Sequence, residues 1–169
     1  MRNLELEICW NNEPNGRQTL IIDGKEVAKN MQINQFEKIT RYIPQLETGD
    51  FGDWIFDKEN DGTPEHSYHF PFVNYSQVVC AFQDDLFAFC KEHPEYEYTN
   101  YNKTLEENGI DWRKNSMEAA DVSTLNAKAV IALLVGAWRA ERFCDGAFSF
   151  FFESGAILRW LKRLQEIEE

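Results

Sequence analysis

The stretch AVIALLVGAW at Ala129–Trp138 decides the fold of this chain. It is too short to cross a membrane, which takes about 20 apolar residues in a helix, and charged residues follow it directly at Arg139, Glu141 and Arg142. A helix that is apolar on most of its faces must be surrounded by other elements. The stretch therefore predicts a helix at the centre of a helical bundle.

The bounds of this central helix follow from the residues around the apolar stretch. Ser123 or Thr124 provides a capping side chain at its start, and such residues favour helix N-termini. We expect the helix to run through Ala140 and to end near Gly146. Gly136 lowers helix propensity, and we expect it to allow a close helix–helix contact.

Periodic apolar residues predict further helices on both sides. A helix capped by Ser76 and running to about Lys91 carries the stripe Val79, Phe82, Leu86 and Phe89, which has helical spacing. The last helix, Ala156–Ile167, turns Ile157, Leu161 and Leu164 inward. A first helix is predicted at Gln32–Tyr42, with Ile33, Phe36 and Ile39 or Thr40 on one side, before Pro44. Short helices such as Lys103–Asn108 are expected within 95–121.

The N-terminal region alternates apolar and polar residues with the period of a strand. Leu4–Trp10, Gln18–Asp23 and Lys25–Ala28 are separated by Pro14, Asn15-Gly16 and Gly24, which favour turns. Two strands alone are marginally stable, so we expect this hairpin or small meander to pack on helices. The fold class is α+β, mainly α, in a single domain spanning 1–169, with a β region at 1–30 and a helical region at 31–169.

An aromatic, irregular segment joins the two halves at residues 47–74. Short extended pieces are expected around Trp54–Phe56 and Tyr68–Val73, and Pro71 argues against a central strand there. Exposed aromatic residues beside acidic ones are typical of protein interfaces, which have an apolar core and a polar rim.

The charge of the chain restricts its partners. The sequence has 29 acidic and 17 basic residues, a net charge of −12. Residues 61–122 alone contain 12 acids and 4 bases, 4 − 12 = −8. A direct nucleic-acid binder would need a basic surface, and binding to anionic lipid would need one as well. We expect neither partner.

The N-terminus and the cysteines point to the cytoplasm. The start MRNLELEICW lacks the basic and apolar regions of a secretory signal, and no stretch is long enough for a membrane span. The four cysteines, Cys9, Cys80, Cys90 and Cys144, show no C-x-x-C spacing. Free cysteine packs as a small apolar residue, and we expect free thiols in the core, with Cys80 and Cys90 on the apolar face of the 76–91 helix.

Three segments together resemble a bacterial family known only as domain of unknown function 6508. They are FGDW at 51–54, FPFVNYSQVVCAF at 70–82 and the block at 133–164. The motif residues that match are Pro71, Val73, Tyr75, Ser76, Arg139, Arg142, Phe143, Cys144, Gly146, Gly155, Ile157, Leu161 and Leu164. The resemblance covers about residues 40–165 and excludes the β start at 4–29. It implies a shared fold and a shared site, and no particular activity.

The candidate ligand-binding residues are Arg139, Arg142, Tyr75 and Trp54. Two guanidinium groups three residues apart on a helix share a face, and beside aromatic rings they suit a phosphate or carboxylate. The alternative is an internal ion-pair network, because an unpaired buried charge is costly. Asp145 or Glu141 would be the acid partner.

Other constellations are explained by ordinary structure. His66 and His69 form H-x-x-H between Pro64 and Pro71, where a helix is not expected. The acidic run from Asp57 resembles the start of a calcium loop but has Tyr68 at the position of the required glutamate. We expect no metal, no cofactor and no catalytic residues.

Three functions remain open. The favoured one is a cytoplasmic, non-enzymatic protein-binding module whose partner is another protein or a second copy. The second is a small enzyme or anionic-ligand-binding domain that uses Arg139 and Arg142. The third is an acidic inhibitor that mimics nucleic acid, suggested by the charge of residues 61–122.

Overall fold

The computed structural model describes residues 8–12, 17–22, 25–32, 35–60 and 62–168. The chain divides into two compact units, residues 1–35 and 36–169, and each is described by itself. The expected single domain, with the β region packed on the helices, stays a prediction.

The first unit is an antiparallel meander of three strands in the order β1-β2-β3, as predicted. Its strands are β1 (Ile8–Asn12), β2 (Arg17–Ile22) and β3 (Lys25–Gln32). Ile8 lies opposite Ile22, and Arg17 lies opposite Gln32. The predicted turns at Pro14, Asn15-Gly16 and Gly24, and the residues 4–7 of the first predicted strand, lie outside the described residues.

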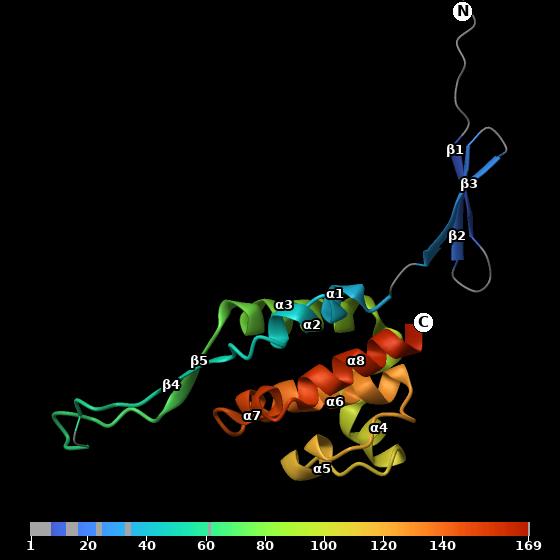
Figure 1. Ribbon diagram of the computed structural model, residues 1–169. Coiled ribbons are helices and arrows are strands. Elements are labelled where there is room, and N and C mark those ends of the chain that lie inside the picture. Colours follow the sequence, from blue (N-terminus) through green and yellow to red (C-terminus); the bar gives the residue numbers. More distant parts are fainter. Residues whose placement is uncertain (1–7, 13–16, 23–24, 33–34, 61, 169) are drawn as a thin grey trace, which may run out of the picture. The chain divides into compact units, whose positions relative to one another are not determined.

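The second unit is a helical bundle with one additional strand pair, so the fold is α+β and mainly α, as predicted (Figure 1). Its elements are α1 (Glu37–Thr40), α2 (Ile43–Leu46), β4 (Gly52–Ile55), β5 (Phe72–Tyr75), α3 (Gln77–Glu92), η1 (Pro94–Tyr96), η2 (Tyr98–Asn100), α4 (Tyr101–Glu107), α5 (Lys114–Glu118), α6 (Ala127–Ala140), α7 (Ala147–Glu153) and α8 (Ala156–Glu168).

Helix α6 is the centre of the bundle, as the apolar stretch predicts. Every residue from Ala129 to Ala137 is buried, and α4, α7 and α8 pack around the helix. The predicted start at Ser123 or Thr124 is wrong, because Asn126 is the capping residue: its Oδ1 accepts a hydrogen bond from the Ala129 N–H at 2.9 Å.

The end of α6 also differs from the prediction. The helix stops at Ala140, and Gly146 precedes the next helix, α7, with a left-handed φ of 78°. The phenylalanine-rich segment after Gly146 therefore forms a helix of its own, α7.

Gly136 makes the close contact that its position predicts. A Cβ atom at this position would lie 2.8 Å from Met117 Cε of α5 and 3.5 Å from Leu105 Cδ1 of α4. The missing side chain thus lets two neighbouring helices approach the backbone of α6.

Helix α3 agrees closely with the sequence. Ser76 Oγ accepts from the Val79 N–H at 3.4 Å and caps the helix. The predicted stripe is buried: Val79, Phe82, Leu86 and Phe89. The last helix, α8, likewise buries Ile157, Leu161 and Leu164, and α4 covers the expected short helix at Lys103–Asn108 with Gly109 after it.

The cysteines only partly occupy core positions. Cys80, Cys90 and Cys144 are free thiols, and burial raises the pKa of the Cys90 thiol to about 12. Cys80 is exposed, which corrects the prediction. It lies one residue from Val79, about 100° around the helix from the buried stripe, and Cys144 is exposed in the turn after α6.

The first predicted helix, Gln32–Tyr42, is wrong in extent. Gln32 belongs to β3 because it pairs with Arg17 of β2. The helix is split into α1 and α2, with Pro44 in the first turn of α2, where proline needs no N–H partner. Phe36 and Ile39 are buried as expected, and Ile33 lies outside the described residues.

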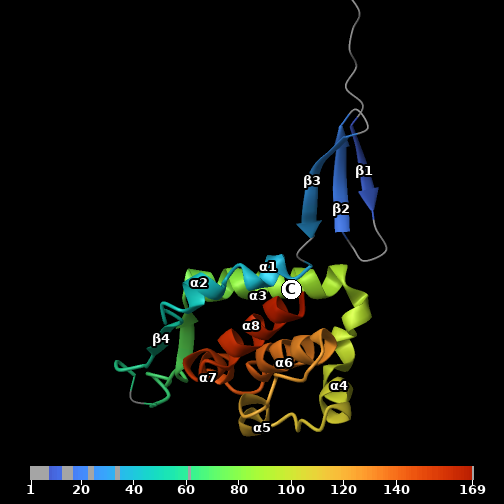
Figure 2. The same cartoon turned by 45° about the vertical axis from the view of Figure 1, so that its right-hand side comes forward.

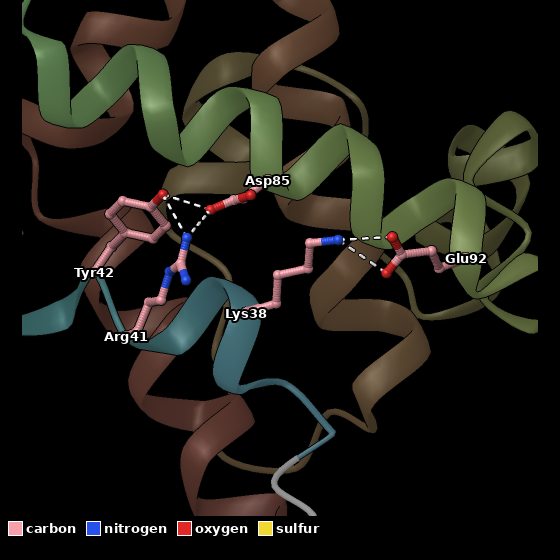
Figure 3. Close-up of polar contacts among 5 residues, drawn as sticks. All are labelled: Lys38, Arg41, Tyr42, Asp85 and Glu92. Atoms are coloured by element: carbon pink, nitrogen blue, oxygen red, sulfur yellow. Dashed lines mark hydrogen bonds and ion pairs between the residues drawn. The ribbon is translucent and has the colours of Figure 1, made fainter.

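Two polar contacts fasten α1 and the start of α2 to α3 (Figure 3). Lys38 Nζ lies 2.7 Å from Glu92 Oε1. Asp85 accepts hydrogen bonds from the Tyr42 hydroxyl at 2.5 Å and from the Arg41 guanidinium. Burial, with the hydrogen bond to Asp85, raises the pKa of Tyr42. These pairs hold the buried side of α1 against the buried stripe of α3.

Truncation of Phe82 tests this packing. The ring is fully buried and contacts Tyr42 and Phe152 with centroid separations of 5.6 Å and 5.9 Å. Phe82→Ala is expected to lower the free energy of unfolding by ~3–5 kcal/mol, as for other buried phenylalanines. Asp84→Ala, at an exposed position of the same helix, is the control and should change it by less than about 0.5 kcal/mol. Urea melts of both variants give the comparison; similar losses would contradict the packing.

Candidate functional site

A pocket of about 400 Å³ opens where residues of β4, α5, the end of α6 and the start of α7 meet. Its lining is largely aromatic and aliphatic, and its charged members are Lys114 and Asp145. Ligand pockets commonly have this size and this predominance of apolar side chains. The full lining is Trp54, Trp112, Lys114, Met117, Ala140, Phe143, Cys144, Asp145, Gly146, Ala147 and Phe151.

Three of the lining aromatic residues are open to solvent. Phe143 is 78% exposed, Trp54 42% and Trp112 38%. The rings of Trp112 and Phe143 are nearly perpendicular, with centroids 5.9 Å apart. Large rings usually bury most of their surface, so these three leave an uncovered aromatic surface around the pocket.

Only glycine at position 146 leaves room for the indole ring of Trp54. A Cβ atom at Gly146 would lie 2.2 Å from Trp54 Cζ2, which is far inside van der Waals contact. The left-handed φ of 78° at Gly146 is a second reason for glycine. The indole of Trp54 therefore lies directly on the backbone between α6 and α7.

Glu141 stabilises the turn between α6 and α7. Its carboxylate accepts hydrogen bonds from the Gly146 N–H at 3.0 Å and from the Phe148 N–H at 2.8 Å. The first N–H groups of a helix lack partners within the helix, and a carboxylate there is favoured by the helix dipole. Glu141 thus ends α6 and starts α7.

Tyr75 braces the same turn from the end of β5. Its hydroxyl oxygen accepts from the Ser149 N–H at 3.2 Å, and the ring packs edge-on against Phe148 with centroids 6.1 Å apart. Burial, followed by the hydrogen bond with Glu141, raises the pKa of Tyr75 far above its ordinary value. The phenol is therefore a neutral structural group at physiological pH.

The two charged residues of the lining differ in the contacts that their side chains make. The Lys114 ammonium lies 3.7 Å from the ring centroid of Phe150, a residue outside the lining, so a cation–π contact already uses its charge. Asp145 is exposed and forms no ion pair with any described residue. The carboxylate of Asp145 is therefore available to a ligand.

The structure separates the four residues that the sequence singled out. Trp54 lines the pocket and Tyr75 supports it. Arg139 lies against Trp138, with its guanidinium 5.9 Å from the ring centroid, and Arg142 is exposed in the turn after α6. Neither arginine is part of the pocket lining. That they would act together at the pocket stays a prediction.

The expected pairing of these arginines with Asp145 or Glu141 is wrong within the described residues. Glu141 gives both carboxylate oxygens to backbone N–H groups instead. Helix α6 ends at Ala140, and Arg142 follows it in a turn in which the Arg142 N–H donates to the Arg139 carbonyl at 3.2 Å. Neither arginine forms an ion pair with a described carboxylate.

A second feature is the hairpin arm, which we define as β4, β5 and their connection 56–71. Asp53 pairs with Asn74 and Trp54 with Val73 in an antiparallel register. In both views this arm extends away from the helices (Figures 1 and 2). The sequence predicted extended pieces here, and it missed that Phe72–Tyr75 forms the second strand.

The hairpin arm exposes a concentration of apolar side chains. Phe70 is 84% exposed. Ile55, Phe56, Phe70 and Phe72 surround one concave surface, and Trp54 stacks near Phe56 with ring centroids 6.1 Å apart. The complete set is Trp54, Ile55, Phe56, Tyr68, Phe70 and Phe72.

Asp57 organises the connection of the hairpin arm. Its carboxylate accepts hydrogen bonds from the backbone N–H groups of Glu59, Asn60 and His69 and from the Asn60 amide. The His69 ring nitrogen Nδ1 lies 3.1 Å from Asp57 Oδ2. These contacts lower the pKa of Asp57 strongly, and the hydrogen bond from the His69 N–H contributes most. The motif that mimics a calcium loop is a hydrogen-bonded turn.

The described residues show neither a metal-binding cluster nor a membrane-spanning helix. No group of three or more His, Cys, Asp or Glu side chains there is arranged to hold a metal ion. No helix in this part of the chain is both long and apolar enough to cross a membrane.

Comparison with known proteins identifies the family. The model of a family of unknown function, DUF6508, matches residues 31–169, and the chain belongs to that family. This confirms the resemblance drawn from the sequence motifs. No curated protein and no solved structure matches the chain.

Several pocket residues were missed by sequence reasoning. Trp112 and Lys114 come from a polar region that showed only weak helical signals, and their proximity to Phe143 is a tertiary contact. The signal that was available is the dipeptide Asp145-Gly146, because Asp-Gly marks a turn in which glycine adopts a special backbone conformation.

Replacement of Gly146 tests the contact with Trp54. Gly146→Ala is expected to cost about 1–2 kcal/mol for the left-handed backbone and more for displacing the indole. Gly109→Ala is the matched control, because Gly109 also has a positive φ, 72°, but has nothing within 4 Å of its Cβ position. Urea melts should show the larger loss for Gly146→Ala, with a change in tryptophan emission. Equal effects in the two variants would contradict the contact.

Titration of Asp57 tests the turn of the hairpin arm. The lowered pKa means that ionised Asp57 stabilises the folded turn at pH values above the ordinary carboxyl pKa of about 3.9. This contribution is lost as the pH falls through the depressed pKa of the folded protein. We expect the NMR signal of the Asn60 amide proton, which is donated to Asp57 Oδ1, to show no carboxyl transition near pH 4 and to shift only in stronger acid. Asp57→Asn should lack this transition; a transition centred near pH 4 in the wild type would refute the network.

Proposed function

We propose that the protein is a cytoplasmic, non-enzymatic protein-binding module of a bacterial family and that the hairpin arm is its contact surface. The observation that carries the proposal is the set of apolar side chains that the hairpin arm exposes. A folded chain gains by burying such surface, and a protein partner supplies a large apolar surface that can cover it.

The exposed apolar surface of the hairpin arm is large enough for this role. Aromatic side chains have surfaces of roughly 150–250 Å², so the exposed fractions of the arm residues, summed over both faces of the strand pair, amount to on the order of 600 Å². The largest apolar patch of a typical monomer is about 300–600 Å² and is often functional. A standard interface buries about 800 Å² on each partner.

The charges around the arm suggest the kind of partner. Asp53, Glu59 and Glu65 are exposed on it, against a single cation at Lys58. Acidic groups on the rim of an apolar surface favour a partner with basic residues around its own apolar patch. The net charge of −12 disfavours direct contact with nucleic acid.

Site-specific photo-crosslinking tests the proposal. A photoreactive phenylalanine analogue replaces Phe70, which is 84% exposed, in cells that express the protein. The control places the same analogue at Arg113, whose side chain is also 84% exposed but lies outside the hairpin arm. The Phe70 position is expected to give a discrete crosslinked species that the Arg113 position does not give.

A second variant separates specific binding from general stickiness. Phe72→Ser changes another exposed arm residue and should remove the crosslink from position 70 without lowering the melting temperature. Crosslinks that are equally frequent at both positions, or unaffected by Phe72→Ser, would refute the proposal. A crosslinked species with twice the mass of the chain would identify the partner as a second copy.

A further inference from the structure

The pocket between β4, α5 and the α6–α7 turn offers two kinds of contact at once. Its walls include the exposed rings of Trp54, Trp112 and Phe143, and its one carboxylate among the described lining residues is that of Asp145. Aromatic ring faces carry partial negative charge, and they attract organic cations, which is how aromatic cages recognise ammonium groups.

The cations near the pocket do not satisfy Asp145. The ammonium of Lys114 lies over Phe150, 3.7 Å from the ring centroid, and Lys114 forms no ion pair with Asp145. Arg139 lies against Trp138, and neither Arg139 nor Arg142 is part of the lining. Lys114 also shows that a ring of this region accepts an ammonium group.

A second carboxylate strengthens the negative character of this corner. Glu141 accepts a hydrogen bond from the N–H of Gly146, a lining residue, and Asp145 itself lines the pocket, so both carboxylates belong to the turn that borders it. Both lie in a chain with a net charge of −12, and a net field of this sign attracts cations. The charge pattern therefore opposes the anionic ligand that the two arginines suggested in the sequence.

We propose that this pocket binds a small organic cation with an apolar or aromatic body, the ammonium group facing Asp145 and the body lying among Trp54, Trp112 and Phe143. The volume of about 400 Å³ suits a molecule with one ring and a short alkylammonium arm, since ligand pockets start at about 300 Å³. This site is independent of the hairpin arm's proposed partner, apart from the shared Trp54.

A set of three matched probes tests the proposal on the full chain. Phenylethylammonium, neutral 2-phenylethanol and anionic 3-phenylpropanoate share a phenyl ring and a short chain but differ in charge. Titrations followed by tryptophan fluorescence and ligand-observed NMR should give the tightest saturable binding for the ammonium probe. Its affinity should fall as salt increases, because screening weakens the contribution of Asp145.

Two variants distinguish the contributions of charge and ring. Asp145→Asn should weaken binding of the ammonium probe about threefold to fivefold, as expected for one exposed ion pair, and should leave 2-phenylethanol unchanged. Phe143→Ala should weaken both probes, and its fold should survive because the ring is 78% exposed. Asp84→Asn, which removes a carboxylate from an exposed position on α3, is the control and should change neither affinity.

The outcomes are decisive in both directions. Tighter binding of phenylpropanoate would overturn the proposal in favour of an anionic ligand, and equal binding of all three probes would show that charge plays no part. An absence of saturable binding by any probe, with a correctly folded protein, would show that the pocket is not a site for this class of ligand. Loss of the crosslink from Phe70 has no bearing on these titrations, so the two proposals fail separately.

Discussion

The burial of α6 is the constraint on which the rest of the helical unit depends. An unbroken run of residues from Ala129 to Ala137 is inaccessible to solvent, and no face of the helix in this run can be left uncovered without exposing apolar surface. The neighbouring helices therefore have to enclose it on all sides. Gly136 contributes by letting Met117 and Leu105 approach the helix backbone, so that α4 and α5 close the side that a bulkier residue would have held open.

The candidate pocket is a by-product of how this buried helix ends. Glu141 captures the N–H groups of Gly146 and Phe148, and the chain turns through a left-handed glycine into α7. That turn presents bare backbone, and Trp54 fills the space next to it. The root of the hairpin arm, the start of α7 and the aromatic pocket are thus built from one turn. A single carboxylate determines the position of groups that lie far apart in the sequence.

The sequence predicted those parts of the fold that local pattern controls. Ser76 and the stripe from Val79 to Phe89 located α3, and the apolar run located α6, because capping and burial act over a few residues. The start of α6 was less predictable, because Ser123, Thr124 and Asn126 are all possible capping residues and only Asn126 caps the helix in the structure. The extent of β3 depended on strand pairing, which local pattern does not reveal.

The candidate site was harder to predict, since it depends on tertiary contacts. Trp54 and Tyr75 were singled out as ligand-binding residues, which stays a prediction; in the structure Trp54 lines the pocket and Tyr75 accepts a hydrogen bond from α7. The arginines were singled out on their spacing, which could not reveal that Glu141 gives both carboxylate oxygens to backbone N–H groups or that other residues line the pocket. Trp112 and Lys114 carry no local signal that connects them with Phe143, because that contact depends on how α5 packs.

The hairpin arm has a consequence for the behaviour of the protein in concentrated solution. It is a two-stranded sheet within the described residues, so the outer edge of each strand presents unpaired backbone groups beside apolar side chains. Such edges act as templates for the addition of further strands and for aggregation. The acidic residues on the arm, Asp53 and Glu59 among them, oppose this by mutual repulsion between copies. The negative charge of this region therefore disfavours aggregation through the exposed apolar surface.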